Sequence, residues 1–431
     1  IFYNDGNYPA GAGNADAVVT GESGCNFGTA LITEDFNADG KADLAVGAWL
    51  YSSFAGRSYI FYSDGSIPAM ASDADAIITG EASSNYFGYS FTKADFNADG
   101  KNDLVVGAYG YSTSAGRAYI FYNGSIITEN ASGADAMITG EASSQFGFSL
   151  TAGDLNADGE IDLAVGAYNY SSTAGRAYIF YNDGSLPTTG ATADIIITGE
   201  AGSGLGIALT TGDFNADGEV DVVVGAYAYS SNAGRAYIFY NGSIITEAAT
   251  GADVIITGEA SSRLGVSFAS GDLNTDGKTD LVVGGWLYSS SAGRAYIFYN
   301  DGSLPTTAAT ADVIITGESS SQLGVSSVVA DFNVDGKIDL AIGAISYGSG
   351  KGRVYMYTFN DNVTTGGATG DYFGRSLVSG DFNADGKADL AVGASGYSSS
   401  TGRAYIFYGG SALDVSGSTA DITITGEASS Y

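Results

Sequence analysis

A nine-residue pattern, Asp-x-Asn-x-Asp-Gly-x-x-Asp, occurs seven times along the chain. Its copies begin at Asp35, Asp95, Asp154, Asp213, Asp272, Asp331 and Asp381, so consecutive copies are 60, 59, 59, 59, 59 and 50 residues apart. A fixed period of this length is typical of proteins built from one repeated supersecondary unit, in which each unit buries its apolar surface against its neighbours. We therefore expect the 431 residues to form seven similar units of a single domain, 1–431.

Within one unit, four short segments have the composition of β-strands: Phe148–Ala152, Leu163–Ala167, Ala177–Tyr181 and Asp194–Thr198. They are rich in Val, Ile, Tyr and Phe and are separated by Gly, Asn, Asp and Ser. No segment has apolar residues at helical spacing, so no substantial helix is expected. The second and third strands are apolar on both faces, and without helices only other sheets can cover them. We predict an all-β fold, a seven-bladed β-propeller of four-stranded antiparallel blades. A sandwich or a linear solenoid explains seven near-equal units less simply.

The two ends of the chain contain more strand segments than seven blades need. Residues 1–26 form a half-repeat, in which Ile1–Tyr3 and Asp16–Glu22 match a third and a fourth strand. The last unit nevertheless has its own copies at Tyr405–Tyr408 and Asp421–Glu427. We expect either that a spare half-unit packs outside the ring or that the natural chain is longer, as the start at Ile1 also suggests. The sixth unit is shortened at Asn360–Asp371, which predicts a weak outer strand.

The repeated pattern also predicts metal sites. Oxygen ligands at positions 1, 3, 5 and 9, a main-chain carbonyl at position 7 and a glycine in the sharp turn suit Ca²⁺. An EF-hand would carry Glu at position 12, where the first copy has Val46. The alternative is a hairpin rich in Asp and Asn that binds no metal. The prediction is up to seven Ca²⁺ ions, one per repeat, at Asp35, Asn37, Asp39, Lys41, Asp43, Asp95, Asn97, Asp99, Lys101, Asp103, Asp154, Asn156, Asp158, Glu160, Asp162, Asp213, Asn215, Asp217, Glu219, Asp221, Asp272, Asn274, Asp276, Lys278, Asp280, Asp331, Asn333, Asp335, Lys337, Asp339, Asp381, Asn383, Asp385, Lys387 and Asp389.

Charge and composition exclude several classes of function. The net charge is −32, from 48 acidic and 16 basic residues, so the surface repels nucleic acid and anionic membranes. The chain has no histidine, which removes histidine-based triads and histidine-ligated zinc. Cys25 is the only cysteine and stands where other repeats have Ser84 or Ser144, so we interpret it as a small-residue substitution. No run approaches the roughly 20 apolar residues of a transmembrane helix.

The order FG, DFNADGKADLAVGA and GRAYIFY resembles the FG-GAP repeat of the integrin α-chain N-terminal β-propeller, over essentially the whole chain. The resemblance implies a seven-bladed propeller, calcium in the hairpin loops between the first two strands, and extracellular recognition or adhesion. It implies the same calcium ligands, namely Asp35, Asn37, Asp39 and Asp43 and their equivalents. The chain departs from the family where GAP is expected, because it reads GAW, GAY, GGW, GAI or GAS. Integrin-type partner binding is therefore not carried over.

The face opposite the calcium loops carries repeated aromatic residues, at Trp49/Tyr51, Tyr109/Tyr111, Tyr168/Tyr170, Tyr227/Tyr229 and Trp286/Tyr288. They are expected either to bind a glycan or protein ligand or to pack between blades, and Ile345 and Ser395 interrupt the series. Arginines follow glycine at Arg57, Arg117, Arg176, Arg235, Arg294, Arg353 and Arg403. Their expected partners are Glu22, Glu81, Glu141, Glu200, Glu259, Glu318, Asp371 and Glu427, in structural pairs.

These observations favour a secreted or cell-surface calcium-binding propeller that acts as a recognition or adhesion module. The expected partner is a protein or glycan on the face opposite the calcium loops, with neither nucleic-acid binding nor membrane insertion. One alternative is a structural subunit of an extracellular filament or sheath, self-associating through the redundant terminal strands. A carbohydrate-active enzyme is a third reading, but no catalytic residues are predicted and we expect no enzymatic activity. Glycosylation sequons occur at Asn123, Asn130, Asn169, Asn241 and Asn362.

Overall fold

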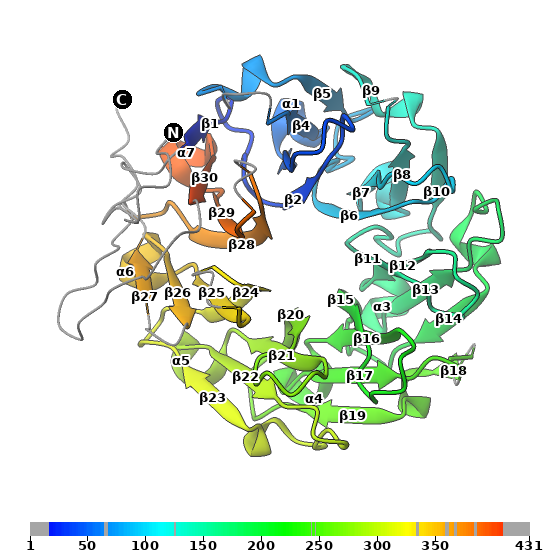
Figure 1. The fold of residues 1–431 in the computed structure, drawn as a ribbon, viewed down its shortest axis with the longest axis vertical. Helices are drawn as coiled ribbons and strands as arrows, with labels where there is room; N and C mark the ends of the chain where they lie inside the picture. Colours follow the sequence, from blue (N-terminus) through cyan, green and yellow to red (C-terminus); the bar gives the residue numbers. More distant parts are fainter. Residues whose placement is uncertain are drawn as a thin grey trace.

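The computed structural model describes residues 17–63, 68–124, 126–242, 244–245, 247–332, 336–357, 362–365, 369–382 and 386–407. These residues form seven sheets around a common axis, each with four antiparallel strands (Figure 1). Two of the sheets gain a fifth, two-residue strand that pairs in parallel with the outer strand. The predicted seven-bladed β-propeller is confirmed. The blades are numbered one to seven in the order of their Asp-rich loops.

Blades one to six take their strands in sequence order from the axis outward, whereas the outer strand of blade seven is β1 (Ala17–Thr20). Blade one consists of β2 (Leu31–Glu34), β3 (Asp43–Ala48), β4 (Arg57–Phe61), β5 (Ala76–Thr79) and β9 (Glu129–Asn130). Blade two consists of β6 (Ser90–Ala94), β7 (Asp103–Ala108), β8 (Arg117–Phe121) and β10 (Ala136–Thr139). Blade three consists of β11 (Ser149–Gly153), β12 (Asp162–Ala167), β13 (Arg176–Phe180), β14 (Ile195–Thr198) and β18 (Glu247–Ala248). Blade four consists of β15 (Leu205–Gly212), β16 (Asp221–Ala226), β17 (Arg235–Phe239) and β19 (Val254–Thr257), and blade five of β20 (Leu264–Gly271), β21 (Asp280–Gly285), β22 (Arg294–Phe298) and β23 (Val313–Thr316). Blade six consists of β24 (Leu323–Ala330), β25 (Asp339–Ala344), β26 (Arg353–Tyr357) and β27 (Asn362–Thr365). Blade seven consists of β28 (Phe373–Gly380), β29 (Asp389–Ala394), β30 (Arg403–Phe407) and β1.

The last blade combines strands from both ends of the described chain. Strand β1 pairs antiparallel with β30, with Ala17 opposite Ile406 and Thr20 opposite Arg403. The N-terminal half-repeat therefore supplies the fourth strand that closes the ring, while Ile1–Tyr3 and Asp421–Glu427 lie outside the described residues. In the shortened sixth unit, β27 still pairs with β26 over four residues.

The apolar core lies between neighbouring blades, as expected for strands that are apolar on both faces. The cluster between blades three and four packs Ala164 and Ile179 against Val222 and Tyr237, all four of them fully buried. The second strand of every blade is buried along its whole length. Each blade therefore covers one face of the next, and removal of this apolar surface from water is the main favourable contribution to folding.

A pair of glycines sets how closely adjacent blades approach. A Cβ atom built on Gly225, in the second strand of blade four, would lie 2.0 Å from the carbonyl oxygen of Gly265 in the next blade. A Cβ atom built on the equivalent glycine of each blade would lie 1.9–2.1 Å from the equivalent carbonyl oxygen of the next blade. These glycines are Gly47, Gly107, Gly166, Gly225, Gly284, Gly343 and Gly393. The glycine of each VGA-type segment thus fits against the glycine of the next FG or LG pair, which explains why the two motifs recur together.

Between the second and third strands, each blade has one short turn of unusual hand. In blade three, Ser171 has φ 47° and ψ 65°, and Ser172 has φ 56° and ψ 46°, so the turn is left-handed. These turns are α1 (Tyr51–Phe54), α2 (Tyr111–Ser114), α3 (Tyr170–Thr173), α4 (Tyr229–Asn232), α5 (Tyr288–Ser291), α6 (Tyr347–Gly350) and α7 (Tyr397–Ser400). Left-handed residues other than glycine cost about 1–2 kcal/mol each, so packing must hold them in place. Within the described part of the chain, no helix is long and apolar enough to cross a membrane.

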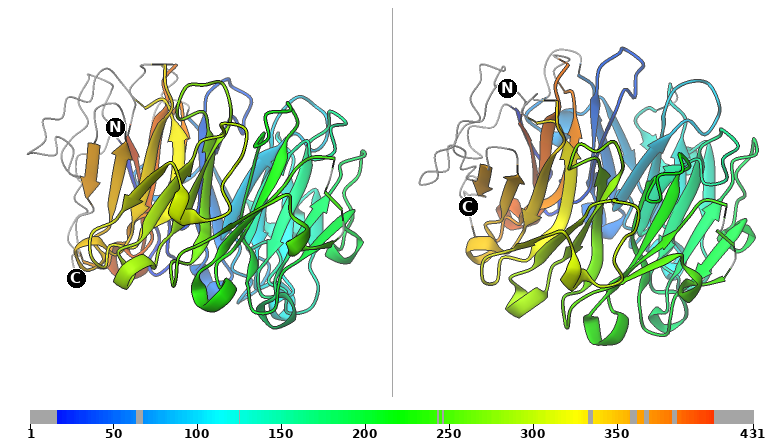
Figure 2. Two further views of the ribbon diagram at one scale, coloured as in Figure 1. Left: turned by 90° about the horizontal axis from the view of Figure 1, so that it is seen from below. Right: turned by 60° about the horizontal axis from the view of Figure 1, so that its bottom comes forward.

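The turns define two faces of the ring. All of the short turns gather on one face, which we call the turn face (Figure 2). The Asp-rich loops join the first strand of each blade to the second, at the other end of the antiparallel strands, and we call that side the loop face. Blades are also linked on the turn face, because the N–H of Gly204 in blade four donates to the Thr173 carbonyl in turn α3 at 2.7 Å.

Candidate functional site

The Asp-rich segments form tight hairpin loops on the loop face. The carboxylate at position 1 accepts a hydrogen bond from the N–H of the glycine at position 6, at 2.7–3.0 Å in all seven loops. That glycine has φ of 83–92° in every loop, a conformation that other L-residues rarely adopt. A Cβ at this position would meet no other atom, so lack of space does not explain the glycine. The recurring glycine is therefore required by the backbone conformation.

Oxygen atoms from positions 1 and 3 converge in the first five loops. In the third loop, the N–H of Asp158 donates to Asp154 Oδ1 at 3.1 Å and to Asn156 Oδ1 at 3.0 Å. The same pair of hydrogen bonds, at 2.9–3.1 Å, occurs in the first, second, fourth and fifth loops. Two predicted ligand oxygens thus already lie beside one another, which is the arrangement that a shared cation needs.

The aspartate at position 9 lies deeper than the other predicted ligands. Asp162 is fully buried, and its two oxygens accept the N–H groups of Leu155 at 2.8 Å and Asn182 at 2.9 Å. Burial, together with the charges of Asp158 and Asp154, raises the pKa of Asp162 to about 6, although the two main-chain hydrogen bonds act to lower it. Because a carboxylate has about four lone-pair positions, both oxygens keep the capacity for another partner.

The donor set fits a hard cation in ligand type and in the convergence of positions 1 and 3. In the described residues, however, no group of three or more His, Cys, Asp or Glu side chains is arranged to hold a metal ion. The position-5 carboxylate instead accepts the N–H of position 7, as in Asp158 with Glu160 at 2.9 Å. At position 7 itself, the Lys41 ammonium donates to the Ser63 carbonyl at 2.9 Å. The predicted ligands Asn333, Asp335, Asn383 and Asp385 lie outside the described residues. Calcium binding in the loops remains a prediction.

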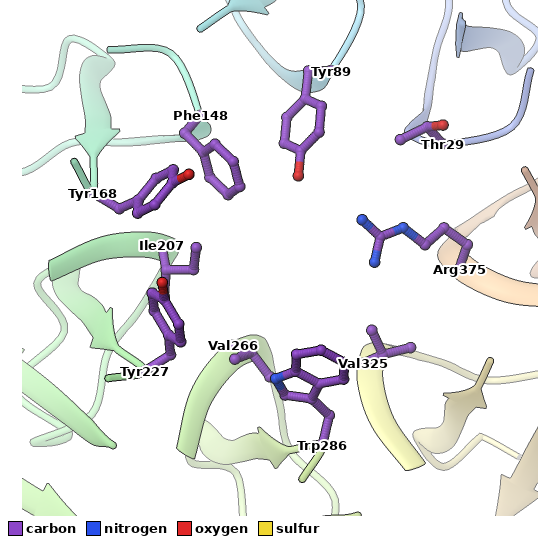
Figure 3. Close-up of a pocket in the computed structure, with 10 residues that line it drawn as sticks. All are labelled: Thr29, Tyr89, Phe148, Tyr168, Ile207, Tyr227, Val266, Trp286, Val325 and Arg375. Atoms are coloured by element: carbon purple, nitrogen blue, oxygen red, sulfur yellow. The ribbon is translucent and has the colours of Figure 1, made fainter. Parts of the chain in front are cut away.

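The turn face contains a pocket of about 330 Å³ at the axis of the ring. Each blade contributes the residue that directly follows its FG or LG pair: Thr29, Tyr89, Phe148, Ile207, Val266, Val325 and Arg375. Three aromatic residues that end second strands complete the wall: Tyr168, Tyr227 and Trp286. Figure 3 shows that the side chains from all seven blades surround one space, with the Arg375 guanidinium extended into it.

Aromatic rings form a continuous arc from blade one to blade four around this pocket. Successive ring centroids are 5.4 Å apart for Trp49 and Tyr86, 4.6 Å for Tyr86 and Tyr109, and 4.7 Å for Tyr109 and Tyr89. The arc continues through Phe148 to Tyr168 at 4.4 Å and to Tyr227 at 6.3 Å. Ile345 and Ser395 replace aromatic residues in blades six and seven, so the face is asymmetric. The first aromatic residue of each predicted pair thus belongs to this face.

The second aromatic residue of each pair has a structural role. The guanidinium carbon of Arg57 lies 3.6 Å from the centroid of the Tyr51 ring in the same blade. The same stacking, at 3.5–3.7 Å, occurs in all seven blades, on Tyr51, Tyr111, Tyr170, Tyr229, Tyr288, Tyr347 and Tyr397. These tyrosines therefore pack on the scaffold, but against an arginine of their own blade and not between blades as the alternative had it.

The stacked arginines also join adjacent blades. Arg176 in blade three donates to Glu141, which follows the outer strand of blade two, at 2.5 Å. Six such ion pairs occur, from Arg57 with Glu22 to Arg353 with Glu318, at 2.5–2.9 Å. A buried tyrosine, such as Tyr178, donates its hydroxyl to the same carboxylate. Six of the predicted structural Arg–carboxylate pairs are therefore present among the described residues, and they join one blade to the next.

Arg375 and the residues after the FG and LG pairs were not among the residues singled out from the sequence. When the seven units are aligned, this position holds Thr, Tyr, Phe, Ile, Val, Val and Arg beside glycines that do not vary. Such variation between fixed neighbours is the signal that could have identified the pocket. The comparison of Cys25 with Ser84 is wrong, because Cys25 and Asn85 are equivalent by their main-chain bonds to Leu50 and Gly110.

Two of the five sequons are buried. Asn123 and Asn241 are at most 9% exposed, and their side-chain amide nitrogens donate to main-chain carbonyls in the preceding loop region. They are not available for glycan attachment in the folded protein. Asn130 is exposed, and the side chain of Asn362 lies outside what the structure describes.

Comparisons with known proteins agree with this architecture. The FG-GAP repeat family matches residues 27–61, 87–121 and 373–407, and the FG-GAP-like repeat family matches 154–224, 213–283 and 272–342, so that matches fall on all seven blades. Phosphatidylinositol-glycan-specific phospholipase D from Bos taurus is 29% identical over 233 residues, which cover 49% of this chain and 28% of that protein. The Homo sapiens phospholipase of the same name is 36% identical over 231 residues, covering 48% of this chain and 27% of its own length.

Integrin alpha-PS2 from Drosophila melanogaster is 31% identical over 220 residues, which cover 47% of this chain and 15% of that integrin. The chain thus spans less than a third of the length of these relatives. The repeats, the strand order and the integrin similarity lead to one conclusion. This chain belongs to the FG-GAP repeat family and is an integrin-like FG-GAP β-propeller.

Proposed function

We propose that this propeller is an extracellular, calcium-binding recognition module that holds a protein or glycan ligand on its turn face and serves in adhesion. The observation that carries the proposal is the axial pocket, to which all seven blades contribute and which an arc of aromatic rings surrounds. Concave, largely apolar sites with a few polar groups are typical of binding sites. Aromatic rings supply large contact areas that remain rigid, which favours recognition.

Calcium in the loops is part of the same proposal. Support comes from the converging oxygens of positions 1 and 3 and from the all-oxygen donor set. The ion would be held by Asp154, Asn156 and Asp158 with the carboxylate of Asp162, and by the equivalent residues of the other loops. Bound there, Ca²⁺ would neutralise the loop carboxylates. Extracellular sites of this kind commonly bind at roughly 10⁻⁴–10⁻³ M, which matches calcium levels outside cells.

A protein and glycan ligand array, probed with the intact chain in calcium and in EDTA, tests the recognition role. We expect at least one ligand class to be retained in calcium and to be lost or weakened in EDTA. A variant of the turn face, Tyr168→Ala, should weaken the retained ligand, whereas Asp183→Ala on an exposed loop should not. An array without a specific ligand in either condition contradicts the proposal.

We further propose that the chain is not itself an enzyme. Among the residues that the structure describes, those that line the axial pocket include no carboxylate and no cysteine, and the chain contains no histidine. The Bos taurus and Homo sapiens relatives described above are named as phospholipases, but the chain covers less than a third of each of them. A carbohydrate-active or lipid-cleaving role would be supported by calcium-dependent hydrolysis in a broad substrate screen, and we expect none.

A structural subunit of a filament or sheath is the second candidate. It is favoured by the position of β1, which pairs with the edge of β30, because the sequence of Asp421–Glu427 also matches a fourth strand. In this candidate function, the second fourth-strand sequence pairs with the edge of a neighbouring chain. Size-exclusion chromatography with light scattering separates the two, because a monomer at all concentrations supports recognition alone and concentration-dependent polymers support assembly.

A further inference from the structure

Two arginines do not take part in the arginine–tyrosine stacking that recurs in every blade. The chain has nine arginines, and seven of them stack on the tyrosine of their own blade. The other two are Arg263 in blade five and Arg375 in blade seven. Arg375 lines the axial pocket, and Arg263 lies against two of the rings that line it, although the two come from different blades and from different positions of the repeat. In a chain of net charge −32, one positive charge in the pocket and a second beside its wall point to an anionic ligand.

Arg375 is the charged residue of the pocket wall. It follows Phe373–Gly374 at the start of β28, and its guanidinium points into the pocket from the side that faces Tyr89 (Figure 3). The Tyr89 hydroxyl is its polar neighbour across the pocket. In the described residues, no carboxylate forms an ion pair with Arg375. A guanidinium has five N–H donors, so a planar pair of them remains for a ligand oxyanion.

Arg263 lies at the other side of the same wall. Its guanidinium carbon is 5.4 Å from the Tyr227 ring centroid and 5.5 Å from that of Trp286, and both rings line the pocket. One of its nitrogens, Nε, donates to the side-chain oxygen Oδ1 of Asn232 at 3.3 Å, which orients the side chain. Arg263 therefore adds positive potential beside the rings without entering the space that they surround.

Apart from Thr29 and the polar ends of the tyrosines and Trp286, the remainder of the wall is apolar. Five aromatic rings occupy blades two to five, where Ile207 and Val266 lie beside them, and Val325 lies between Trp286 and Arg375 (Figure 3). A sugar would need hydrogen-bond partners around its ring, and the aliphatic part of this wall supplies none. An apolar group with one terminal carboxylate matches the wall better, because its body contacts the rings while its carboxylate reaches Arg375. A volume of about 330 Å³ suits a group of side-chain size.

We propose that the axial pocket binds a carboxylate of a protein partner, presented by an acidic residue that adjoins hydrophobic side chains. The proposal rests on the recognition function above and specifies its ligand chemistry. Arg375 is the specificity-determining residue, since its planar donor pair matches a carboxylate and the other six blades carry uncharged residues at its position. Arg263 and the aromatic rings position the apolar part of the ligand.

The chain carries a reporter for this pocket. Trp286 lines it, and the only other tryptophan is Trp49, at a position where blades two, three and four have tyrosine. The variant Trp49→Tyr therefore leaves Trp286 as the single tryptophan. We would titrate this variant with 4-phenylbutyrate, with its uncharged amide and with glucuronate, and follow Trp286 emission. We expect a saturable change with 4-phenylbutyrate, at about millimolar Kd for so small a probe, and little or none with the other two.

Matched variants in the Trp49→Tyr background identify the residue responsible. Arg375→Val introduces the residue that blades five and six carry at this position, so the fold should be kept. It should weaken 4-phenylbutyrate binding at least about tenfold, because charge-assisted hydrogen bonds discriminate by that much. Lys351→Ala removes the same charge from the turn face outside the pocket and gives the residue found in five other blades, so binding should be unchanged.

Each other outcome has a defined meaning. Equal binding of the acid and the amide, unchanged binding in Arg375→Val, or no binding of 4-phenylbutyrate overturns the proposal. Binding of glucuronate alone, with the same dependence on Arg375, overturns the peptide ligand in favour of an acidic sugar. If the ligand array finds a partner whose binding Arg375→Val does not affect, this inference fails while the recognition function stands. If the array finds none but the probe binds through Arg375, the pocket stands and the adhesion role fails.

Discussion

Arg57 in the first blade donates from Nη1 to Glu22 Oε1 at 2.7 Å, and Glu22 lies two residues after β1, the strand that completes the last blade. The pair therefore spans the junction at which the ring closes. The Tyr59 hydroxyl donates to the same carboxylate oxygen at 2.8 Å, and Arg57 Nε donates to Thr79 at 2.9 Å. The same contacts, repeated between other blades, provide polar links across interfaces that are otherwise apolar.

A double-mutant cycle on Arg176 and Glu141 should reveal this coupling. Both side chains are less than a third exposed, and each has further partners, so the pair should contribute more than an ordinary surface ion pair. We expect Arg176→Ala and Glu141→Ala each to lower the free energy of unfolding by about 1–3 kcal/mol, with a coupling of about 1–2 kcal/mol. Urea unfolding measures both quantities. Additive effects of the two substitutions would show that the pair contributes nothing specific.

Gly225→Ala should be among the most destabilising single substitutions in this chain. The new Cβ would lie 2.0 Å from the Gly265 carbonyl oxygen, and this backbone atom cannot move without separating two blades. We expect a loss of at least about 3 kcal/mol, measured by thermal or urea unfolding. Gly202→Ala is the control, since its φ of 72° is unfavourable but nothing lies within 4 Å of a new Cβ. Its cost should stay near 1–2 kcal/mol. Equal losses would contradict the interblade contact.

Calcium should stabilise the fold in proportion to the number of occupied loops. Each loop filled at ten times its Kd adds about 1.4 kcal/mol, because the ion binds only the folded chain. Differential scanning calorimetry in calcium and in EDTA should therefore show a large drop in Tm on chelation. Asp158→Ala should lower by one the number of Ca²⁺ ions bound per chain, measured by calorimetric titration. The charge-matched control Asp183→Ala, on an exposed loop, should leave this number unchanged. Identical melting curves with and without EDTA would remove calcium from the proposed function.

Asp162 should stabilise its blade even when no metal is present. Its two oxygens accept two main-chain N–H groups inside the protein, and an amide can offer only one oxygen. In EDTA, Asp162→Asn should lose about 1–3 kcal/mol, because one buried N–H is left facing the side-chain NH₂. Asp158→Asn, at an exposed position of the same loop, should cost little under the same conditions. If both variants unfold alike in EDTA, the buried aspartate acts only through the metal.

Cys25 should report on the ring closure. Its buried thiol donates to the Thr401 carbonyl at 3.1 Å, and burial raises the pKa of Cys25 to about 11. Because the pKa of this thiol is higher in the folded chain, the free energy of unfolding is unaffected by it below about pH 8.5, the pKa of an unfolded thiol. As the pH rises from about 8.5 toward about 11, the unfolded thiol ionises first and the free energy of unfolding falls. At pH 8, iodoacetamide should modify the folded chain roughly two orders of magnitude more slowly than the urea-unfolded chain.

Cys25→Ser is the control for that measurement. Serine makes the same bond in four other blades, as Ser144 does with the Ala115 carbonyl at 2.9 Å, so the variant should fold with little loss of stability and should not be modified. Rapid modification of the native protein would mean that the first and last blades separate often. Such a result would also indicate a weak closure.

The architecture could be predicted from the sequence because each repeat is locally consistent. In the third unit, the four predicted strands agree with β11 to β14 within one residue at every end, since alternating aromatic and β-branched residues and Gly-rich turns determine them. The left-handed turns were not predicted. Their Ser-rich sequences have no intrinsic preference for such backbone angles, which depend on contacts with the next blade, such as that of Gly204 with Thr173.

The candidate site was predictable in part. The aromatic positions were found because they repeat, but their division into stacked and pocket-lining rings depends on where each strand ends. Arg375 was missed for the opposite reason, since a residue that occurs once in seven units gives no periodic signal. Tyr89 and Arg375 are 286 positions apart in the chain, and only closure of the ring places them across one space.

The way in which β1 pairs with β30 determines how the ring would respond to force. The strands are antiparallel, so Ala17 and Ile406 lie opposite one another at the same end of the pair. Tension between a segment attached before Ala17 and one attached after Phe407 would load the hydrogen bonds one after another, from that end toward Thr20. A pair loaded in this way separates by unzipping at low force, whereas a pair loaded along its length resists until all its bonds break together. An adhesive contact that pulls on both sides of this blade would therefore open the ring at its closure first.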